Sequence, residues 1–247
     1  MAEFKFPTEE IELPSKGLVY PKDNPLSSGK VEIKYMTARE DDILSNQSYI
    51  QKGTVLDKLL QSLIISEGVK VDDLIVGDKN ALLIASRILG YGKEYEFEYD
   101  GKTESVDLTE LENKPINEKE FSNKNEFSYK FSSSGNEVTY KLITGKDDKL
   151  IKRELEGYKK INKEASPELT TRLKRIILSV NGDDDQKTIR EFVDNNLLAI
   201  DARALRNYIK DIQPDVDLKY NYEDNRGRVK AINIPVGINF FWPDVEL

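Results

Sequence analysis

The chain has 247 residues and a net charge of −8, with 38% hydrophobic and 33% charged residues, which is typical of a globular protein with a modest core. It contains no cysteine and no histidine, which excludes disulfides, thiolate metal sites and histidine-based catalysis. The acidic balance argues against nucleic-acid or anionic-membrane partners, and the sequence has neither a membrane-spanning apolar run nor a signal peptide, so we expect synthesis in the cytoplasm.

Residues 1–28 are predicted to form an extended N-terminal arm. Four prolines forbid a long helix here, and Ile11 and Leu13 alternate with polar residues as in an edge strand. The arm either lies across its own first module or clasps a neighbouring subunit. For the second case, the predicted partner-binding residues of the arm are Leu13, Pro14, Leu18 and Tyr20.

The segment that follows the arm occurs twice. Residues 31–44, VEIKYMTAREDDIL, are matched 107 positions later by residues 138–151, VTYKLITGKDDKLI. In both copies, alternating apolar residues are followed by a threonine and, three positions on, by an acid. The two pairs are Thr37 with Glu40 and Thr144 with Asp147. This pattern predicts a strand that leads into a capped helix.

Similar patterns recur farther along the chain. An apolar stripe with helical spacing occupies residues 56–64 and occurs again, 113 positions later, in residues 169–177. Two further matching pairs are residues 81–89 with 197–205, and the alternating aromatics of residues 94–102 with 216–227. We therefore predict an α+β fold of two tandem related modules, each a small antiparallel sheet or hairpin packed with about three helices.

The boundary between the modules is expected in residues 113–125. This stretch is polar, contains Pro115 and shows no sustained periodicity, as a linker does. The first module then covers residues 29–112 and the second covers residues 126–247. Because the spacing between copies grows along the chain, small insertions are expected in the loops of the second module.

Acidic clusters are the main candidates for chemistry. Asp41 and Asp42 are neighbours in a predicted first turn, where the helix dipole is a sufficient reason for acids. Adjacent side chains of a helix diverge, so we do not expect the two to act as paired catalytic carboxylates. Residues 181–185, NGDDD, lack the spacing of an EF-hand loop, so we expect a solvated loop there, with a weak divalent site as the alternative. Phosphate-binding and nucleophile-elbow motifs are absent from the sequence. We predict no enzyme activity, no catalytic residue, no cofactor and no metal.

The chain ends in AINIPVGINFFWPDVEL, in which Ile232 and Ile234 begin a predicted strand. Three consecutive aromatic residues cannot all face one core from a strand, so at least one is expected to point outward and to serve a protein interface. The alternative is that all three wedge between the two modules. The predicted partner-binding residues of this end are Phe240, Phe241, Trp242 and Pro243.

Several of these segments resemble a known family. The arm ELPSKGLVYP, the following GKVEIKYMTAREDDIL, the amphipathic helix after Gly53 and the terminal FFWP are similar to baseplate proteins of T4-type contractile-tailed bacteriophages, in the baseplate hub assembly group. Members of that family often carry a Cys-x-x-Cys pair, like a small zinc ribbon, in the hairpin before FFWP. Residues 224–227 stand at that place here without a cysteine, so no zinc role is carried over.

The resemblance implies a non-enzymatic structural or assembly protein of the virion, made in the host cytoplasm, that contacts other baseplate and hub proteins. It implies neither a nucleic-acid nor a membrane partner. Two similar modules also suggest self-association as a trimer or hexamer around a sixfold baseplate. One alternative is a tail or hub assembly chaperone that is absent from the mature particle. A more remote alternative is a carboxylate-dependent cell-wall hydrolase, which needs two acids roughly 5 to 10 Å apart.

Overall fold

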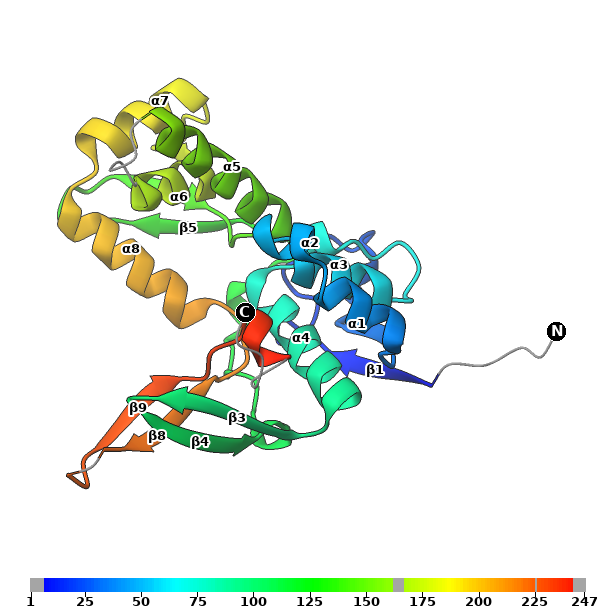
Figure 1. Ribbon diagram of the computed structural model, residues 1–247. Coiled ribbons are helices and arrows are strands. Elements are labelled where there is room, and N and C mark those ends of the chain that lie inside the picture. Colours follow the sequence, from blue (N-terminus) through cyan, green and yellow to red (C-terminus); the bar gives the residue numbers. More distant parts are fainter. Residues whose placement is uncertain (1–6, 162–166, 225, 242–247) are drawn as a thin grey trace.

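The computed structural model describes residues 7–161, 167–224 and 226–241, and combines helices with small antiparallel sheets (Figure 1). The strands are β1 (Thr8–Glu12), β2 (Lys30–Lys34), β3 (Glu94–Tyr99), β4 (Lys102–Asp107), β5 (Phe127–Lys130), β6 (Glu137–Tyr140), β7 (Ile177–Val180), β8 (Lys219–Glu223) and β9 (Val229–Asn233). The helices are α1 (Ala38–Leu44), α2 (Gln47–Gln51), α3 (Val55–Leu63), α4 (Val76–Tyr91), α5 (Gly145–Ile161), α6 (Glu168–Ile176), α7 (Gln186–Glu191) and α8 (Ala199–Ile212). The predicted mixed class is confirmed.

The first unit, from β1 to β4, begins with an antiparallel pair. β1 lies beside β2, and Glu9 stands opposite Ile33. On its other side Ile33 forms a bridge with Ile64, directly after α3. Ile33 is fully buried, so the face of the β1–β2 sheet that carries its side chain packs against the core. β1, which lies within the predicted arm, is therefore an integral strand of the first unit.

The second unit, from β5 to β9, repeats this arrangement. Tyr140 of β6 stands opposite Phe127 of β5 on one side and opposite Ile177, directly after α6, on the other. Ile33 and Tyr140 are 107 residues apart, and Ile64 and Ile177 are 113 apart, which are the spacings found in the sequence. The segments that match in sequence thus have the same strand neighbours.

The helices that follow the two matching strands also begin alike. In α1 the Glu40 carboxylate accepts the Thr37 N–H at 2.8 Å and pairs with Lys34 Nζ at 2.8 Å. The residues that make the same contacts at the start of α5 are Lys141, Thr144 and Asp147, with distances of 2.7 Å to the lysine and 3.2 Å to the threonine N–H. Both acids are buried. Equal contacts at equal spacing support a tandem duplication, which stays a prediction.

Each unit ends with a long helix that leads into a hairpin, α4 into β3–β4 and α8 into β8–β9 (Figure 1). The two helices begin 123 positions apart, at Val76 and Ala199. The sequence match of residues 81–89 with 197–205 has a spacing of 116, seven residues less. Seven residues are almost two helical turns, so the apolar stripe matches in either register.

The two hairpins pack against each other through aromatic rings. Phe97 lies 5.4 Å from Tyr220 and Tyr99 lies 4.9 Å from Tyr222, measured between ring centroids. Both pairs are 123 residues apart in the sequence, so each ring meets its own counterpart. A contact between equivalent residues is what a twofold relation between two units produces.

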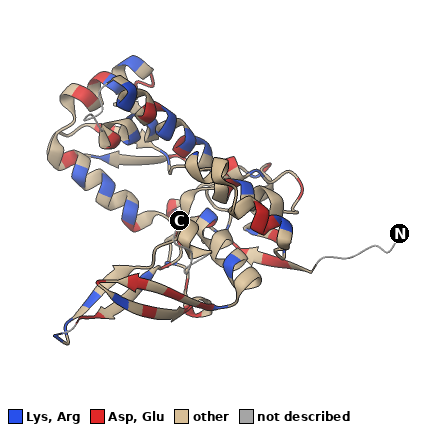
Figure 2. Ribbon diagram, viewed as in Figure 1, with Lys and Arg blue, Asp and Glu red and all other residues tan. Residues whose placement is uncertain are grey.

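Charged contacts join the two units elsewhere. Lys149 of α5 pairs with Asp72 and lies 3.2 Å from Asp57 of α3. Burial raises the pKa of Asp57, but hydrogen bonds and charges from Lys79 and Lys149 outweigh it and lower that pKa overall. Figure 2 shows acidic and basic residues mixed over much of both units, with acidic residues prevailing on the β3–β4 hairpin. The units are therefore held by specific pairs rather than by a general attraction.

Candidate functional site

The turn after β1 is anchored on a buried carboxylate in the first turn of α4. Asp78 accepts hydrogen bonds from the Ser15 N–H (2.9 Å), the Ser15 hydroxyl (2.7 Å) and the Tyr20 hydroxyl (2.6 Å). The Tyr20 oxygen in turn accepts the Ile75 N–H at 3.1 Å. All four residues are buried. Residues 13–20, here called the arm segment, thus fill a site at the start of α4.

Burial and hydrogen bonding set the protonation of this site. Loss of water raises the pKa of the Asp78 carboxyl, and the hydrogen bonds from Tyr20 and Ser15 oppose that shift. The pKa of the Tyr20 hydroxyl is raised well above its ordinary value, first by burial and then by the charge of Asp78. Tyr20 therefore keeps its proton at neutral pH and donates a hydrogen bond to the Asp78 carboxyl group.

The partner-binding residues predicted in the arm belong to this internal site. Leu13, Pro14 and Tyr20 are buried and Leu18 is half-buried. A buried side chain cannot contact a partner without leaving the core. The expectation of an exposed docking surface on the arm is corrected accordingly, because the arm lies across its own first unit.

The aromatic residues near the C-terminal end also pack internally. Phe240 and Phe241 are buried, whereas Trp242 and Pro243 lie outside the described residues. Residues 238–240 form a 3-10 turn and not the continuation of a strand. Consecutive side chains of such a turn point around its axis and not to opposite faces, so both phenylalanines reach the core. An outward-facing Phe240 or Phe241 is therefore excluded.

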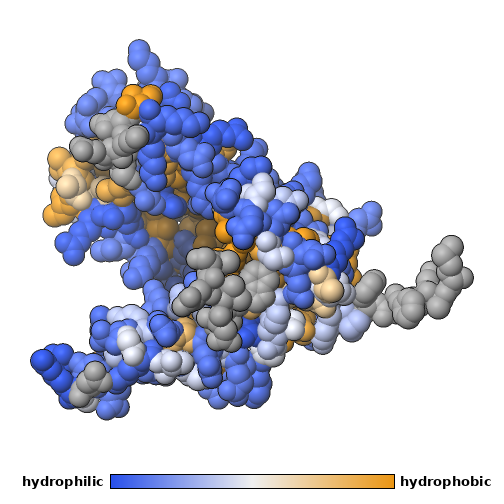
Figure 3. Space-filling view, in the orientation of Figure 1, coloured by the Kyte–Doolittle hydropathy of each residue, from blue (hydrophilic) through white to orange (hydrophobic). Residues whose placement is uncertain are grey.

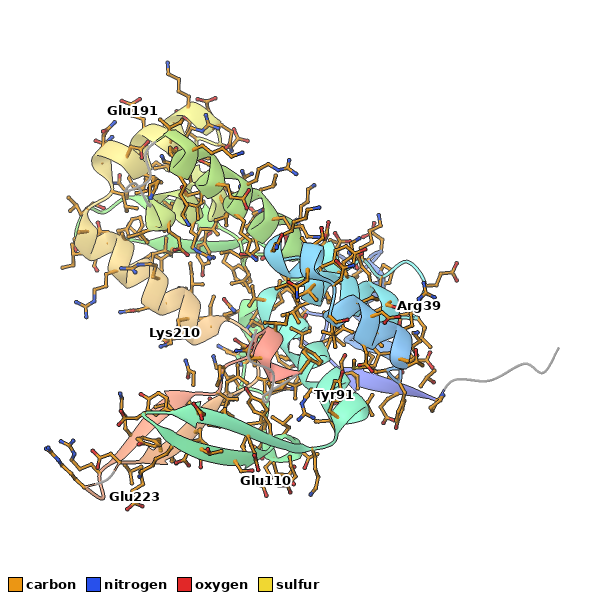
Figure 4. All side chains as sticks on the ribbon, viewed as in Figure 1. Arg39, Tyr91, Glu110, Glu191, Lys210 and Glu223 are labelled. Atoms are coloured by element: carbon orange, nitrogen blue, oxygen red, sulfur yellow. The ribbon has the colours of Figure 1, made fainter. Side chains whose placement is uncertain are left out.

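Arg87 of α4 holds this C-terminal segment in place. Its Nε donates to the Phe240 carbonyl at 3.0 Å, and its two Nη atoms donate to the carbonyls of Gly92 and Glu94 at 2.8 and 3.1 Å. Tyr91, at the end of α4 in Figure 4, meets the Phe241 ring at 6.3 Å. One buried guanidinium thus ties the C-terminal segment, α4 and the start of β3 together.

A hollow of about 490 Å³ opens between the tips of the two hairpins. It is lined by Tyr99, Asp100, Tyr222, Asp224, Arg228 and Lys230. Arg228 Nη2 pairs with the Asp224 carboxylate at 2.7 Å, and Lys230 Nζ lies 5.7 Å from the centre of the Tyr99 ring. The Asp224 carboxylate also accepts the Arg226 N–H at 2.8 Å. Asp224 and Arg228 therefore close the β8–β9 turn, whereas Lys230 faces the other hairpin through Tyr99.

The acidic cluster at 181–185 has a structural role at the start of α7. Asp183 accepts the Asp185 N–H at 2.9 Å and the Thr188 hydroxyl at 3.0 Å, and Asp185 caps the helix by accepting the Lys187 and Thr188 N–H groups. Across the described ranges, no group of three or more His, Cys, Asp or Glu side chains is placed to hold a metal ion. In the same ranges, no helix has both the length and the apolar character needed to cross a membrane.

The second unit contains a counterpart of Asp78 that sequence reasoning did not single out. Asp201 is the third residue of α8, as Asp78 is of α4, and their exposed fractions are 1% and 0%. Within the described part of the chain, Asp201 Oδ2 has no hydrogen-bond partner. Both residues are acids in the first turn of a helix, which is the only sequence feature that they share.

Apolar side chains surround the start of α8 at the surface. Leu198 is 48% exposed and Ile200 is 64% exposed. Figure 3 shows hydrophobic surface at the end of the second unit where α8 begins. Exposed apolar groups beside an unpaired buried carboxylate make this the candidate functional site of the chain.

Comparisons with known proteins identify no relative, since no protein-family model, no curated protein and no solved structure matches the chain. The function is therefore inferred from the residues and their geometry.

Proposed function

We propose that the chain is a structural or assembly protein of the virion that acts at the baseplate and central hub of a contractile phage tail, through contacts with other proteins. The proposal combines the sequence resemblance with the way in which the resembling segments pack. The proposed location is the tail baseplate, and the proposed partners are baseplate and hub proteins and further copies of the chain.

The observation that carries the proposal is that these segments, distant in sequence, contact one another. The arm segment is bound to α4 through Asp78, and the C-terminal segment is bound to the same helix through Arg87. Ile33, in the segment after the arm, forms a bridge with Ile64 at the end of the amphipathic helix. Chance matches would have no reason to form one connected body. Their packing supports the interpretation that the resemblance reflects a shared fold.

The buried polar groups bind other segments of the chain, which supports a role in protein contacts and not in catalysis. Asp78 and Arg87 each bind segments from distant parts of the sequence. Glu40 and Asp147 each fix the start of a helix to the strand before it. These groups are saturated with structural partners, so they are not free to transfer protons to a substrate.

The test is to place a stop codon in the gene of the phage that encodes the chain and to count complete tails by electron microscopy. A structural or assembly protein predicts the loss of complete tails, restored when the wild-type gene is supplied from a plasmid. Normal numbers of complete tails that fail to infect would contradict the proposal and favour the hydrolase alternative.

A further inference from the structure

We propose that the tips of the two hairpins bind a short acidic segment of a partner protein, whose carboxylates pair with Lys102 and Lys230. The inference comes from the contacts between the β3–β4 and β8–β9 hairpins. It does not depend on the assembly in which the chain works.

Each hairpin places a lysine beside a tyrosine at its tip. Lys102 stands opposite Tyr99 across the β3–β4 turn, and Lys230 stands opposite Tyr222 across the β8–β9 turn. The centroids of the two tyrosine rings are 4.9 Å apart, and both rings line the hollow of about 490 Å³ between the tips. The packing of the hairpins therefore brings two equivalent pairs of lysine and tyrosine to one place.

Each lysine reaches across to the ring of the other hairpin. Lys102 Nζ lies 5.4 Å from the centre of the Tyr222 ring and donates to the Glu223 carbonyl at 3.0 Å. Lys230 Nζ lies 5.7 Å from the centre of the Tyr99 ring and donates to the Tyr99 hydroxyl at 3.1 Å. The two rings and these neutral acceptors thus hold both ammonium groups at the same hollow.

Both ammonium groups keep donors for a ligand. An ammonium group has several N–H donors, and each of these lysines uses one of them. Among the described residues, neither lysine is paired with a carboxylate. Lys102 is half-buried and Lys230 is exposed, so both can be reached from solvent. An anionic group that enters the hollow can therefore form charged hydrogen bonds with both.

The remaining charges near the hollow restrict the ligand to one with few acids. The Asp224 carboxylate is neutralised by Arg228, whose Nη2 and Nε lie 2.7 and 2.8 Å away. Asp100 is then the acid that opposes the two lysines at the hollow. Acidic residues prevail on the β3–β4 hairpin, so a long polyanion such as nucleic acid is repelled there (Figure 2). A short protein segment with two carboxylates meets the lysines with much less of this repulsion.

An extended ligand with two acids can reach both lysines, since side chains two positions apart point to the same side, about 7 Å apart. The probe is a fluorescently labelled peptide, Gly-Glu-Val-Asp-Gly, which is titrated with the full chain at low salt while its fluorescence anisotropy is measured. We expect saturable binding that weakens at least tenfold when Lys102→Met and Lys230→Met are combined. The neutral peptide Gly-Gln-Val-Asn-Gly should bind at least tenfold more weakly than the acidic one.

The matched control combines Lys52→Met and Lys187→Met, which remove two lysines that are exposed elsewhere on the chain. It has the net charge of the test variant and should bind the peptide as the wild type does. Because Lys230 is exposed, Lys230→Met alone keeps the test valid if the double variant fails to fold, and it should weaken binding at least threefold. Absence of saturable binding, or binding that these variants leave unchanged, would overturn the proposal. A single-stranded DNA oligonucleotide that binds more tightly and displaces the peptide would overturn it as well.

Discussion

Replacing Tyr20 with phenylalanine tests whether the arm segment is held by its bonds to α4. The change keeps the ring and removes one oxygen, which donates to Asp78 at 2.6 Å and accepts the Ile75 N–H at 3.1 Å. A buried hydrogen bond to a charged group contributes about 1.5 to 3 kcal/mol, and an unpaired buried N–H costs about 1 kcal/mol or more. Asp78 keeps its two bonds from Ser15. We therefore expect Tyr20→Phe to lose about 2 to 4 kcal/mol of the free energy of unfolding.

The assay is equilibrium unfolding in urea at pH 7, with Tyr158→Phe as the matched control, since the Tyr158 side chain is 36% exposed. That control should change the free energy of unfolding by less than about 0.5 kcal/mol. A loss below about 0.5 kcal/mol for Tyr20→Phe would refute the anchoring of the arm through this hydroxyl.

The same variant has a signature at alkaline pH. The pKa of folded Tyr20 is raised well above the ordinary 10.0, so the unfolded chain releases this proton first. The contribution of Tyr20 is complete below pH 10 and is lost as the pH rises from 10 towards the folded pKa. Tyr20→Phe should therefore lose less stability than the wild type between neutral and strongly alkaline pH. Parallel losses would contradict this assignment.

Three other substitutions test the remaining structure by urea unfolding. Burial raises the pKa of Glu40, but hydrogen bonds from the surrounding lysine, serine and threonine lower it to about 2 overall, so the stabilisation by Glu40 is present above pH 4.5 and is lost as the pH falls towards 2. Glu40→Gln should remove about 3 kcal/mol of the free energy of unfolding at pH 7 and flatten its dependence on acid pH. An unchanged loss of stability between pH 4.5 and 2 in the variant would contradict the assignment. Gly77→Ala places a Cβ 1.9 Å from the Pro214 carbonyl oxygen and should destabilise by about 3 kcal/mol, whereas Gly157→Ala in α5, with open space around it, should stabilise by about 0.5 to 1 kcal/mol. Lys149→Met removes the pairs with two acids of the first unit and should lose about 1 kcal/mol at low salt; this difference should narrow at high salt, because the pairs of the wild type are screened there.

The parts of the fold that local patterns encode were predictable. The β3–β4 hairpin follows from the alternation of Tyr95, Phe97 and Tyr99 and from the turn at Asp100 and Gly101, which adopt φ of 52° and 73°. The cap of α1 at Thr37 was predicted from another local pattern, a threonine followed three positions later by Glu40. Each of these features depends on residues within a few positions of one another.

The candidate site was not predictable, because its contacts join residues far apart in the sequence. Ser15 and Asp78 are 63 positions apart, and no local period reports that a hydroxyl will meet a buried carboxylate. Asp201 is recognisable only by comparison with Asp78, once both helices are seen to begin at equivalent places. The inward packing of Phe240 and Phe241 was not predicted for a similar reason, since strand geometry was assumed where a 3-10 turn occurs.

The proposed function implies that a phage encodes the chain, so its most direct test is quantitative mass spectrometry of purified particles of that phage, with a tail protein of known copy number as the standard. A structural protein of the baseplate predicts a small fixed number of copies per tail, three or six if the chain associates around a sixfold baseplate. Absence from purified particles, together with abundance in infected cells, would contradict that role and indicate an assembly chaperone.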